Sequence, residues 1–366
     1  MRGGIEVTDA RKAELPAVGK ISAEIFTEVI YPCLGRKRAS VLVGPQHGVD
    51  IGVVDLGHDT VMALTTDPVF IVPPYGWERS AWFAVHILCS DAATSALPLA
   101  YMTIDLNLPL SIGRAEFERM WRTIHEECEK LGVSIVTGHT GRYEGCEYPM
   151  VGGATVIAIG PRDRYVTPAM ARPGDAVILT KGPAIEATGL FAVTFPQRVA
   201  ARYGDAFARD AEKVFWQMTV VEDARLAAAV GVRDEGVTAM HDATECGVWG
   251  GLVEIAEASR VGMRIEQDRI PVPETVAGVC ELFGIDPFTS ISEGTLLITC
   301  RPTRADEVVR RLTGAGIRAA AIGEVLPPER GCRRVLRGKE EPLVHPRVDP
   351  FWQAFGKAAS EEAPRD

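Results

Sequence analysis

The chain has 366 residues, 46% hydrophobic and 24% charged, which is an ordinary balance for a globular protein. At about 100–200 residues per domain, this length predicts two domains. The 39 Lys and Arg residues against 49 Asp and Glu residues leave a net charge of −10. This balance argues against a general nucleic-acid-binding protein, which needs a basic face, but not against one phosphate ligand held by backbone amides and a metal ion.

Neither membrane insertion nor a disulfide framework is indicated. The sequence contains no uncharged apolar run long enough to cross a membrane, and charged residues precede the first apolar run. Its eight cysteines never occur as C-x-x-C, so they do not indicate a disulfide framework or a zinc site. We therefore expect a cytoplasmic protein with no membrane partner.

The first half of the chain alternates between short apolar runs and helical patterns. Residues 77–96 are apolar nearly all round, which predicts a buried helix, whereas residues 116–131 have one apolar face. Residues 21–30 show helical spacing as well. The expected strands are residues 41–43, 51–56, 61–66, 99–108, 133–136 and 151–159.

A segment rich in proline and glycine, residues 161–175, is the best candidate for a domain boundary. After it we expect strands at 176–180, 237–240, 295–299 and 317–322, and helices at 205–230, 249–259, 275–283 and 304–313. The last forty residues indicate short strands and a polar tail. We expect an N-terminal domain at 1–165, a second domain at 172–330 and a C-terminal extension at 331–366.

Acidic residues at strand ends and in one helix are the candidates for chemistry, because the usual phosphate-binding signatures are absent. Asp50 precedes a strand and Asp67 ends one, positions that an ordinary turn residue also occupies. Asp91 lies in an apolar helix, so its carboxylate is expected to be buried. A buried Asp91 either binds a metal ion or caps a neighbouring loop through hydrogen bonds.

Two further segments follow predicted strands. The first is TGHTG at 137–141, where a tight turn and a ligand site with Thr and His donors are both open. The second is HDATECG at 241–247, before a helix; Asp242 or Thr244 there is either a helix cap or part of a phosphate site. Cys246 is either an inert residue or a thiol with a lowered pKa.

Taken in order, these blocks resemble the AIR synthase (PurM-like) superfamily of ATP-dependent enzymes, with the hydrogenase maturation factor HypE as the nearest branch. The resemblance runs from about Gly19 to about Val325. The matching blocks are GVDIGVV at 48–54, TTD at 65–67, SDAA at 90–93, TGHT at 137–140, TKG at 180–182, HDATECG at 241–247 and SEGTLL at 292–297.

The resemblance implies an α+β fold of two domains and a homodimer. The N-terminal domains would form a β-barrel across the dimer, and the C-terminal α/β domain would cover the cleft. It implies ATP and Mg²⁺ as cofactors, with Asp50, Asp67 and Asp91 as metal ligands and Asp91, His139 and Asp242 as catalytic residues. The implied nucleotide-binding residues are Lys20, Thr66, Asp67, Asp91, Thr137, Gly138, His139 and Thr244.

The sequence also departs from the family pattern. Val49 replaces one acid of the first block, Ser90 replaces an Asn, and Cys246 replaces a Gly. The reactive C-terminal cysteine of HypE has no counterpart here, since the last cysteine is Cys332. We therefore do not expect the self-modifying reaction of HypE, nor selenophosphate synthesis, because no cysteine precedes the first predicted helix.

Three hypotheses follow. The first is a Mg²⁺-dependent enzyme that uses ATP to phosphorylate or activate a carbonyl, amide or acid oxygen of a small molecule. The second is a nucleotide-binding maturation or assembly factor with little turnover, which would act with a partner maturation protein. The third is a degenerate family member that binds no nucleotide. The first needs the distant aspartates to converge around one divalent ion, because clustered carboxylates otherwise repel one another.

Overall fold

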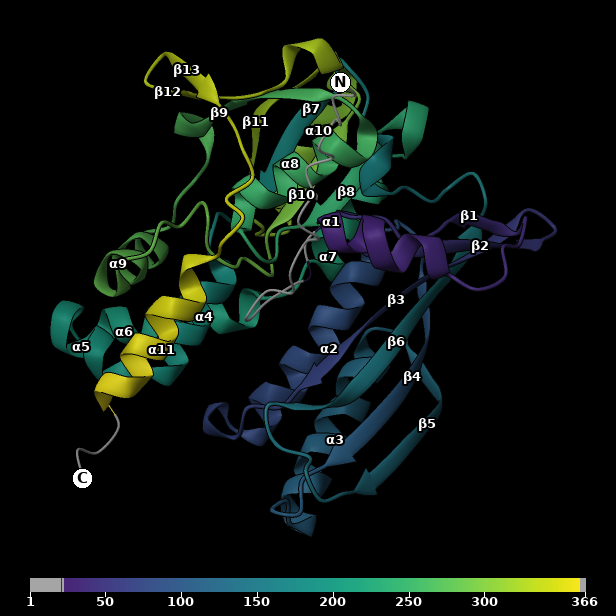
Figure 1. Ribbon diagram of the computed structural model, residues 1–366. Helices are drawn as coiled ribbons and strands as arrows, with labels where there is room; N and C mark the ends of the chain where they lie inside the picture. The colour runs from purple at the N-terminus through teal and green to yellow at the C-terminus, as the bar shows by residue number, and fades with distance from the viewer. Residues whose placement is uncertain (1–20, 22, 363–366) are drawn as a thin grey trace, which may run out of the picture.

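Two β-sheets, one from each half of the chain, organise the molecule (Figure 1). The structure is a computed structural model that describes residue 21 and residues 23–362. The first sheet has the strand order β1-β2-β3-β6-β4-β5, and it is antiparallel except for the parallel pair β4–β5. Its strands are β1 (Val41–Val43), β2 (Gly52–Gly57), β3 (Thr60–Phe70), β4 (Leu99–Leu108), β5 (Ser134–Arg142) and β6 (Met150–Pro161).

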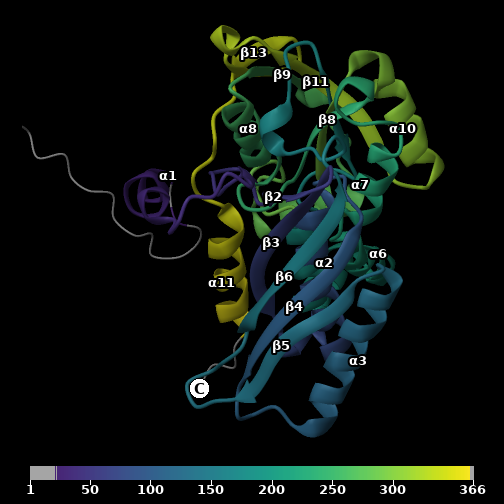
Figure 2. The same cartoon turned by 90° about the vertical axis from the view of Figure 1, so that its right-hand side faces the viewer.

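One face of the first sheet is covered by α2 (Trp77–Ala93) and α3 (Arg114–Lys130), and Figure 2 shows the other face free of helices. Alternation along β4 explains the difference between the faces. Met102, Ile104 and Leu106 are buried in the core beneath the helices, whereas Thr103 and Asp105 lie on the open face. The sheet is therefore half-solvated within this chain.

Helix α2 is the main link between the two halves. Its residues contribute to three separate apolar clusters: Leu88 packs under the first sheet, Trp82 against the helices of the second half, and Ala93 against the second sheet. This explains why its sequence is apolar on all sides. The hydroxyl of Ser90 also accepts a hydrogen bond from the backbone N–H of Val220, at 3.0 Å. The part of α2 that carries Asp91 is thus fixed to both halves.

The second sheet has the order β13-β12-β9-β11-β7-β10-β8, with β12–β9 as its parallel pair. Helices α7 (Val221–Ala228) and α10 (Ala305–Gly314) pack on one face and α8 (Gly247–Ser259) on the other, so the central strands are buried on both sides. The strands are β7 (Ala176–Thr180), β8 (Val237–Asp242), β9 (Gly262–Glu266), β10 (Leu296–Cys300), β11 (Ala319–Leu326), β12 (Cys332–Leu336) and β13 (Lys339–Pro342).

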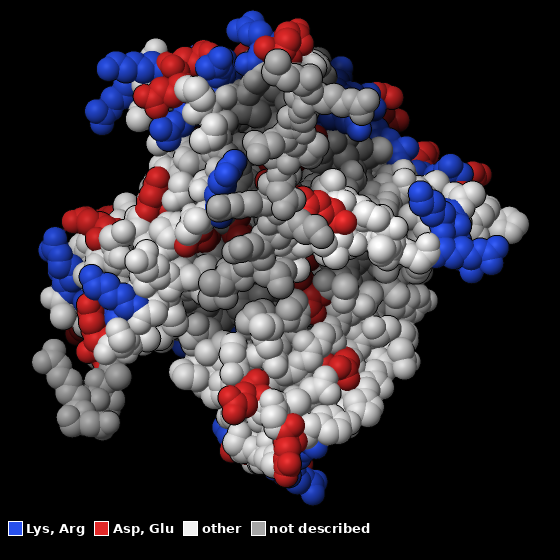
Figure 3. Space-filling view, in the orientation of Figure 1, with Lys and Arg blue, Asp and Glu red and all other residues white. Residues whose placement is uncertain are grey.

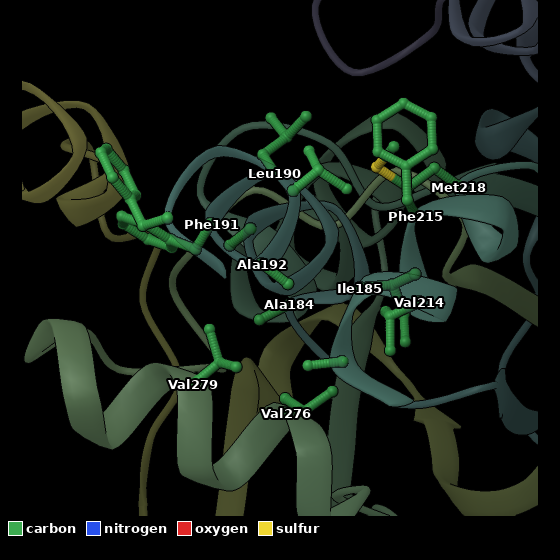
Figure 4. Packing of buried hydrophobic residues seen from close by; sticks show 14 of the residues in the cluster. Ala184, Ile185, Leu190, Phe191, Ala192, Val214, Phe215, Met218, Val276 and Val279 are labelled. Atoms are coloured by element: carbon green, nitrogen blue, oxygen red, sulfur yellow. The ribbon is translucent and has the colours of Figure 1, made fainter. Parts of the chain in front are cut away.

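A cluster of helices beside the second sheet is packed around aromatic side chains (Figure 4). Phe191 stacks on Phe283 with ring centroids 4.0 Å apart, and Phe351 brings the C-terminal helix into the same cluster. The helices are α4 (Ile185–Thr194), α5 (Pro196–Tyr203), α6 (Asp205–Lys213), α9 (Glu274–Phe283) and α11 (Pro350–Glu362).

The two-sheet arrangement confirms an α+β fold with two domains, but one predicted strand is longer than expected and two other segments were predicted wrongly. The predicted strand 133–136 continues to Arg142, because β5 pairs in parallel with the whole of β4. The predicted helix 205–230 is broken by a tight turn at Val214–Gln217, which buries Phe215. The predicted polar tail contains α11, because Phe351 and other apolar residues pack on the aromatic cluster.

The N-terminal helical segment begins with α1 (Ala23–Ile25) and continues in a wider turn over Phe26–Ile30. Among residues 21 and 23–362, the helices all lack the length and hydropathy that crossing a bilayer requires.

Candidate active site between the two sheets

Carboxylates from both halves of the chain converge around Asp91 of α2. Asp91 is 4% exposed, and Oγ1 of Thr65 donates a hydrogen bond to its Oδ2 at 3.0 Å. Burial raises the pKa of Asp91 well above its usual value, and the negative charges of Asp242, Asp67 and Asp50 raise it further. The structure therefore brings Asp50, Asp67 and Asp91 into one electrostatic environment.

Local backbone geometry places Asp50 and Asp67 there. Residues 65 and 67 of β3 point to the same face of the sheet, the face covered by α2, because side chains alternate along a strand. Asp50 follows Gly48, which has φ +71° and lies directly against α8. A Cβ on Gly48 would be 2.8 Å from Cβ of Glu254. The close approach of this loop to α8 brings Asp50 toward the second sheet.

Two carboxylates of the second half are buried without hydrogen-bond partners among the described residues. Asp242, the last residue of β8, is 1% exposed, and Glu293, in the loop before β10, is 2% exposed. Burial raises the pKa of Glu293 well above its usual value, and the charges of Asp242 and Glu186 add to this shift. A buried carboxylate without a partner is costly, so a bound cation or ligand donor would stabilise both groups.

His241 lies among these carboxylates. Its Nε2 is 2.9 Å from Oε2 of Glu254, and its Nδ1 is 3.5 Å from Oδ2 of Asp50 and 3.8 Å from Oδ1 of Asp242. Burial lowers the pKa of His241, but the hydrogen bond and charge of Glu254, with the charges of Asp50 and Asp242, outweigh it and raise the pKa to about 9. In the absence of other cations this imidazole is positively charged at neutral pH.

A second group of predicted residues lies on the opposite, open face of the first sheet. Thr66, Thr137, Gly138 and His139 line a surface pocket of about 390 Å³ there. Thr66 follows Thr65 directly, so its side chain points away from Asp91. His139 Nε2 lies 2.6 Å from the hydroxyl of Tyr143.

The predicted catalytic set of Asp91, His139 and Asp242 is consequently not brought together as a whole. Asp91 and Asp242 interact, but His139 is on the other face of the sheet because it pairs with Asp105, an open-face residue of β4. The segment that contains His139 is a regular part of β5, not a turn.

The remaining predicted residues lie near α8 or outside the described part. Thr244 is half-buried, and its carbonyl accepts hydrogen bonds from the N–H groups of Gly247 and Ser292. Cys246 precedes α8 with φ +63° and is buried, and its N–H donates to Oδ2 of Asp349 at 2.7 Å. Lys20 lies outside the described residues. The roles predicted for Thr244 and Lys20 stay predictions.

The sequence analysis did not select Glu254, Glu293 or His241 as site residues. A signal for Glu254 was present, since it is an acid in the otherwise apolar run VWGGLVEIA, the same argument that selected Asp91. Glu293 and His241 belong to quoted motifs, but their burial depends on packing between the halves. Figure 3 shows acidic side chains in the middle of this face of the molecule, with Lys and Arg mainly at the periphery.

Known proteins resemble this chain over most of its length. The family model for the N-terminal domain of AIR synthase related proteins matches residues 48–159, and the model for the C-terminal domain matches residues 172–334. Carbamoyl dehydratase HypE of Rhizobium leguminosarum bv. viciae is 28% identical over 280 residues, which cover 72% of this chain and 73% of the relative.

Solved structures share the fold. The structure of a HypE–HypF complex contains a chain that superposes with a TM-score of 0.67 at 20% identity, covering 88% of this chain and 99% of that one. A HypE structure in complex with ATP gives 0.60 at 20% identity, covering 92% and 97%. The ThiL structure complexed with AMPPCP and TMP gives 0.62 at 21% identity, covering 80% and 88%. Because its two domain models together span most of the sequence, this chain belongs to the AIR synthase related protein family.

Proposed function

We propose that this protein is a Mg²⁺-dependent, ATP-using enzyme that phosphorylates or otherwise activates a carbonyl, amide or acid oxygen of its substrate. The observation that carries this proposal is the convergence of Asp50, Asp67 and Asp91 beside Asp242, a buried carboxylate that accepts no hydrogen bond from the described residues. A HypE structure in complex with ATP and a ThiL structure complexed with AMPPCP and TMP share this fold, which supports ATP as the cofactor. The sequence has no P-loop, but ATP binding does not require one, since carboxylates and a metal ion can hold a polyphosphate.

The chemistry of the carboxylates fits a hard cation. Asp50, Asp67 and Asp91 would hold Mg²⁺, which prefers oxygen ligands and supplies charge neutralisation for the phosphates. Asp91 and Glu293 have raised pKa values in the absence of a cation, so a cation would remove part of the repulsion that disfavours their ionised forms. Asp242 and Thr244 would line the substrate side from the second domain.

We further propose a homodimer in which a second copy covers the open face of the first sheet. Leu64, Ile157 and Tyr101 are neighbours across β3, β6 and β4 on that face, and Tyr101 is 42% exposed. A half-buried apolar sheet face is stabilised when another layer packs on it. The pocket with Thr66, Thr137, Gly138 and His139 opens on the same face, so the predicted nucleotide contacts would lie at the dimer interface. The β-barrel across this interface and the cytoplasmic location remain part of the proposal.

We infer that Cys332 does not carry the group to be activated. Cys332, the last cysteine among the described residues, is half-buried in β12 between β9 and β13, so the sheet fixes it in place. The HypE–HypF complex suggests a partner maturation protein as one source of the group to be activated, and a free metabolite is the other. Both dehydration after phosphorylation and simple phosphoryl transfer are compatible with the site.

A calorimetric titration of ATP in the presence of Mg²⁺ tests the proposal. We expect the natural chain to bind MgATP and Asp91→Asn to lose that binding, because the substitution removes a buried oxygen ligand. Asp210→Asn is the matched control, since Asp210 is exposed on α6 and pairs with Lys213. Equal affinity of the natural chain and Asp91→Asn would contradict the proposed metal role.

A second candidate function is a nucleotide-binding maturation factor with little turnover. Val49, which is buried and stands where the family has an acid, removes one carboxylate from the first block and favours this alternative. ADP release measured with a panel of carbonyl, amide and acid substrates separates the two. Binding of MgATP without ADP production would support the maturation factor, and substrate-dependent ADP production would support the enzyme.

A further inference from the structure

We propose that Asp50, His241 and Asp242 form a binding site for a first-row transition-metal dication, and that this site needs no nucleotide. Each residue offers one ligand atom, and these atoms all lie within 4.8 Å of one another. Nδ1 of His241 is 3.5 Å from Asp50 Oδ2 and 3.8 Å from Asp242 Oδ1. Ligands of one ion at bond lengths of about 2.0–2.2 Å lie only slightly closer together than this.

The contacts of His241 orient it as a metal ligand. Its Nε2 is 2.9 Å from Glu254 Oε2, and the same carboxylate lies 3.8 Å from Nε2 of His345 through its other oxygen. A metal-binding histidine typically donates its second ring N–H to a carboxylate, which fixes the ring. The incoming ion displaces the proton from the other nitrogen and binds there. Glu254 makes this contact from α8, and Nδ1 consequently faces the two aspartates.

The carboxylate of Asp242 supplies an independent observation. Asp242 is 1% exposed, and neither of its oxygens accepts a hydrogen bond from the described residues. Buried polar atoms in folded proteins are nearly always satisfied, and Nδ1 of His241, at 3.8 Å from Oδ1, is beyond hydrogen-bond distance, so these oxygens indicate a missing ligand. Asp50, whose side chain is 33% exposed, connects the site to solvent and leaves room for water ligands.

The mixed ligand set distinguishes this site from the carboxylates proposed for Mg²⁺. Asp67 and Asp91 contribute only oxygen atoms, whereas His241 contributes a nitrogen. Imidazole suits Zn²⁺, Fe²⁺ and related ions, and Mg²⁺ prefers oxygen ligands. Asp50 lies between the two sets, so an ion at His241 would be adjacent to the proposed MgATP site without depending on it.

The experiment titrates the chelator-treated full chain with Mn²⁺, without nucleotide, and follows free Mn²⁺ by electron paramagnetic resonance. We expect one Mn²⁺ per chain, bound in a large excess of Mg²⁺ and displaced by Zn²⁺, which binds more tightly than Mn²⁺ to such sites. Pulsed measurements on the bound Mn²⁺ should show coupling to an imidazole ¹⁴N nucleus. Absence of that coupling in the natural chain would overturn the proposal, whatever the variants do.

Variants identify the residues. His241→Gln should abolish the ¹⁴N coupling, and Glu254→Gln should weaken Mn²⁺ binding about 10–100-fold, the usual effect of removing such a supporting carboxylate. His86→Gln is the matched control, because His86 Nε2 is 3.2 Å from Glu127 but its Nδ1 meets the hydroxyl of Thr219. Asp67→Asn should leave Mn²⁺ affinity within about twofold while it weakens MgATP binding. Unchanged Mn²⁺ affinity and coupling in His241→Gln would refute the site even if MgATP still binds.

Discussion

Replacing Gly48 with alanine tests how rigidly the Asp50 loop is held against α8. Gly48 has φ +71°, a conformation that costs L-residues about 1–2 kcal/mol. The added Cβ would also lie 2.8 Å from Cβ of Glu254 and 3.3 Å from its Cα. Because both of these Glu254 atoms are tied to the helix backbone, a change of side-chain rotamer cannot relieve the contact. Overpacking of this kind costs about a further 1–3 kcal/mol.

The expected loss in unfolding free energy for Gly48→Ala is therefore about 2–5 kcal/mol. Gly57→Ala is the matched control, because Gly57 has φ +81° but no atom within 4 Å of its added Cβ. The control should lose only the backbone contribution, about 1–2 kcal/mol. Urea unfolding of both variants beside the natural chain measures the difference.

Gly48→Ala should also weaken Mn²⁺ binding, because it pushes the Asp50 loop away from the helix that carries Glu254. Gly57→Ala should not change Mn²⁺ affinity, since its turn lies at the far end of β2. If the two variants lose the same stability, the loop yields to the added methyl group. The close packing of the loop on α8 would then not be what positions Asp50.

Three further predictions concern buried charges. In the absence of divalent ions at pH 7, Asp91→Asn should raise the free energy of unfolding by about 1–3 kcal/mol. The reason is that burial and the neighbouring carboxylates disfavour the ionised form of Asp91. A variant that is less stable than the natural chain in urea would contradict this. Lys181→Met should lower the free energy of unfolding, measured by heat or urea, by about 3–5 kcal/mol, because it leaves the buried carboxylate of Asp223 without its cation. Both oxygens of Asp223 accept hydrogen bonds from Nζ of Lys181 at 2.7 Å. Adding Asp223→Leu should restore part of the lost stability. Burial raises the pKa of Asp349 to about 6, above its value in the unfolded chain. Between about pH 4 and pH 6 the folded chain therefore still binds this proton after the unfolded chain has released it. The contribution of Asp349 to the free energy of unfolding falls by up to about 3 kcal/mol as the pH rises through this range. Asp349→Asn should remove that pH-dependent difference in paired unfolding measurements, and an unchanged pH profile would contradict the assignment.

Strands and helices with a clear periodicity were predictable from the sequence. The strand predicted at 99–108 is β4 (Leu99–Leu108), where apolar and polar residues alternate, and the strand predicted at 176–180 is β7 (Ala176–Thr180), a short apolar run. The apolar character of 77–96 correctly indicated burial of α2. These predictions succeeded because the relevant signal, burial of one or both faces, is local.

Predictions failed where distant packing overrides the local signal. Glycines at 138 and 141 suggest a turn, but pairing with β4 extends β5 through them. The spacing of Phe351, Ala354, Phe355 and Ala358 is that of a helix, yet the polar residues between them concealed α11 until the aromatic cluster it covers was known. The convergence of the aspartates came from the resemblance to a family, because no local pattern brings residues 50, 67, 91 and 242 together.

Strand β3 contributes neighbouring side chains both to the carboxylate cluster beside α2 and to the pocket on the open face of the sheet. Thr65 and Asp67 face α2 and its carboxylates, while Thr66 between them faces the open side of the sheet and its pocket. Because this alternation is fixed by the strand itself, no side-chain rearrangement can bring the Thr66 pocket and Asp91 onto one face. A nucleotide that used both groups would have to extend around the edge of the sheet or bind where a second copy covers the open face. Loss of nucleotide binding in Asp91→Asn together with retained binding in His139→Gln would therefore assign the phosphates to the α2 face alone.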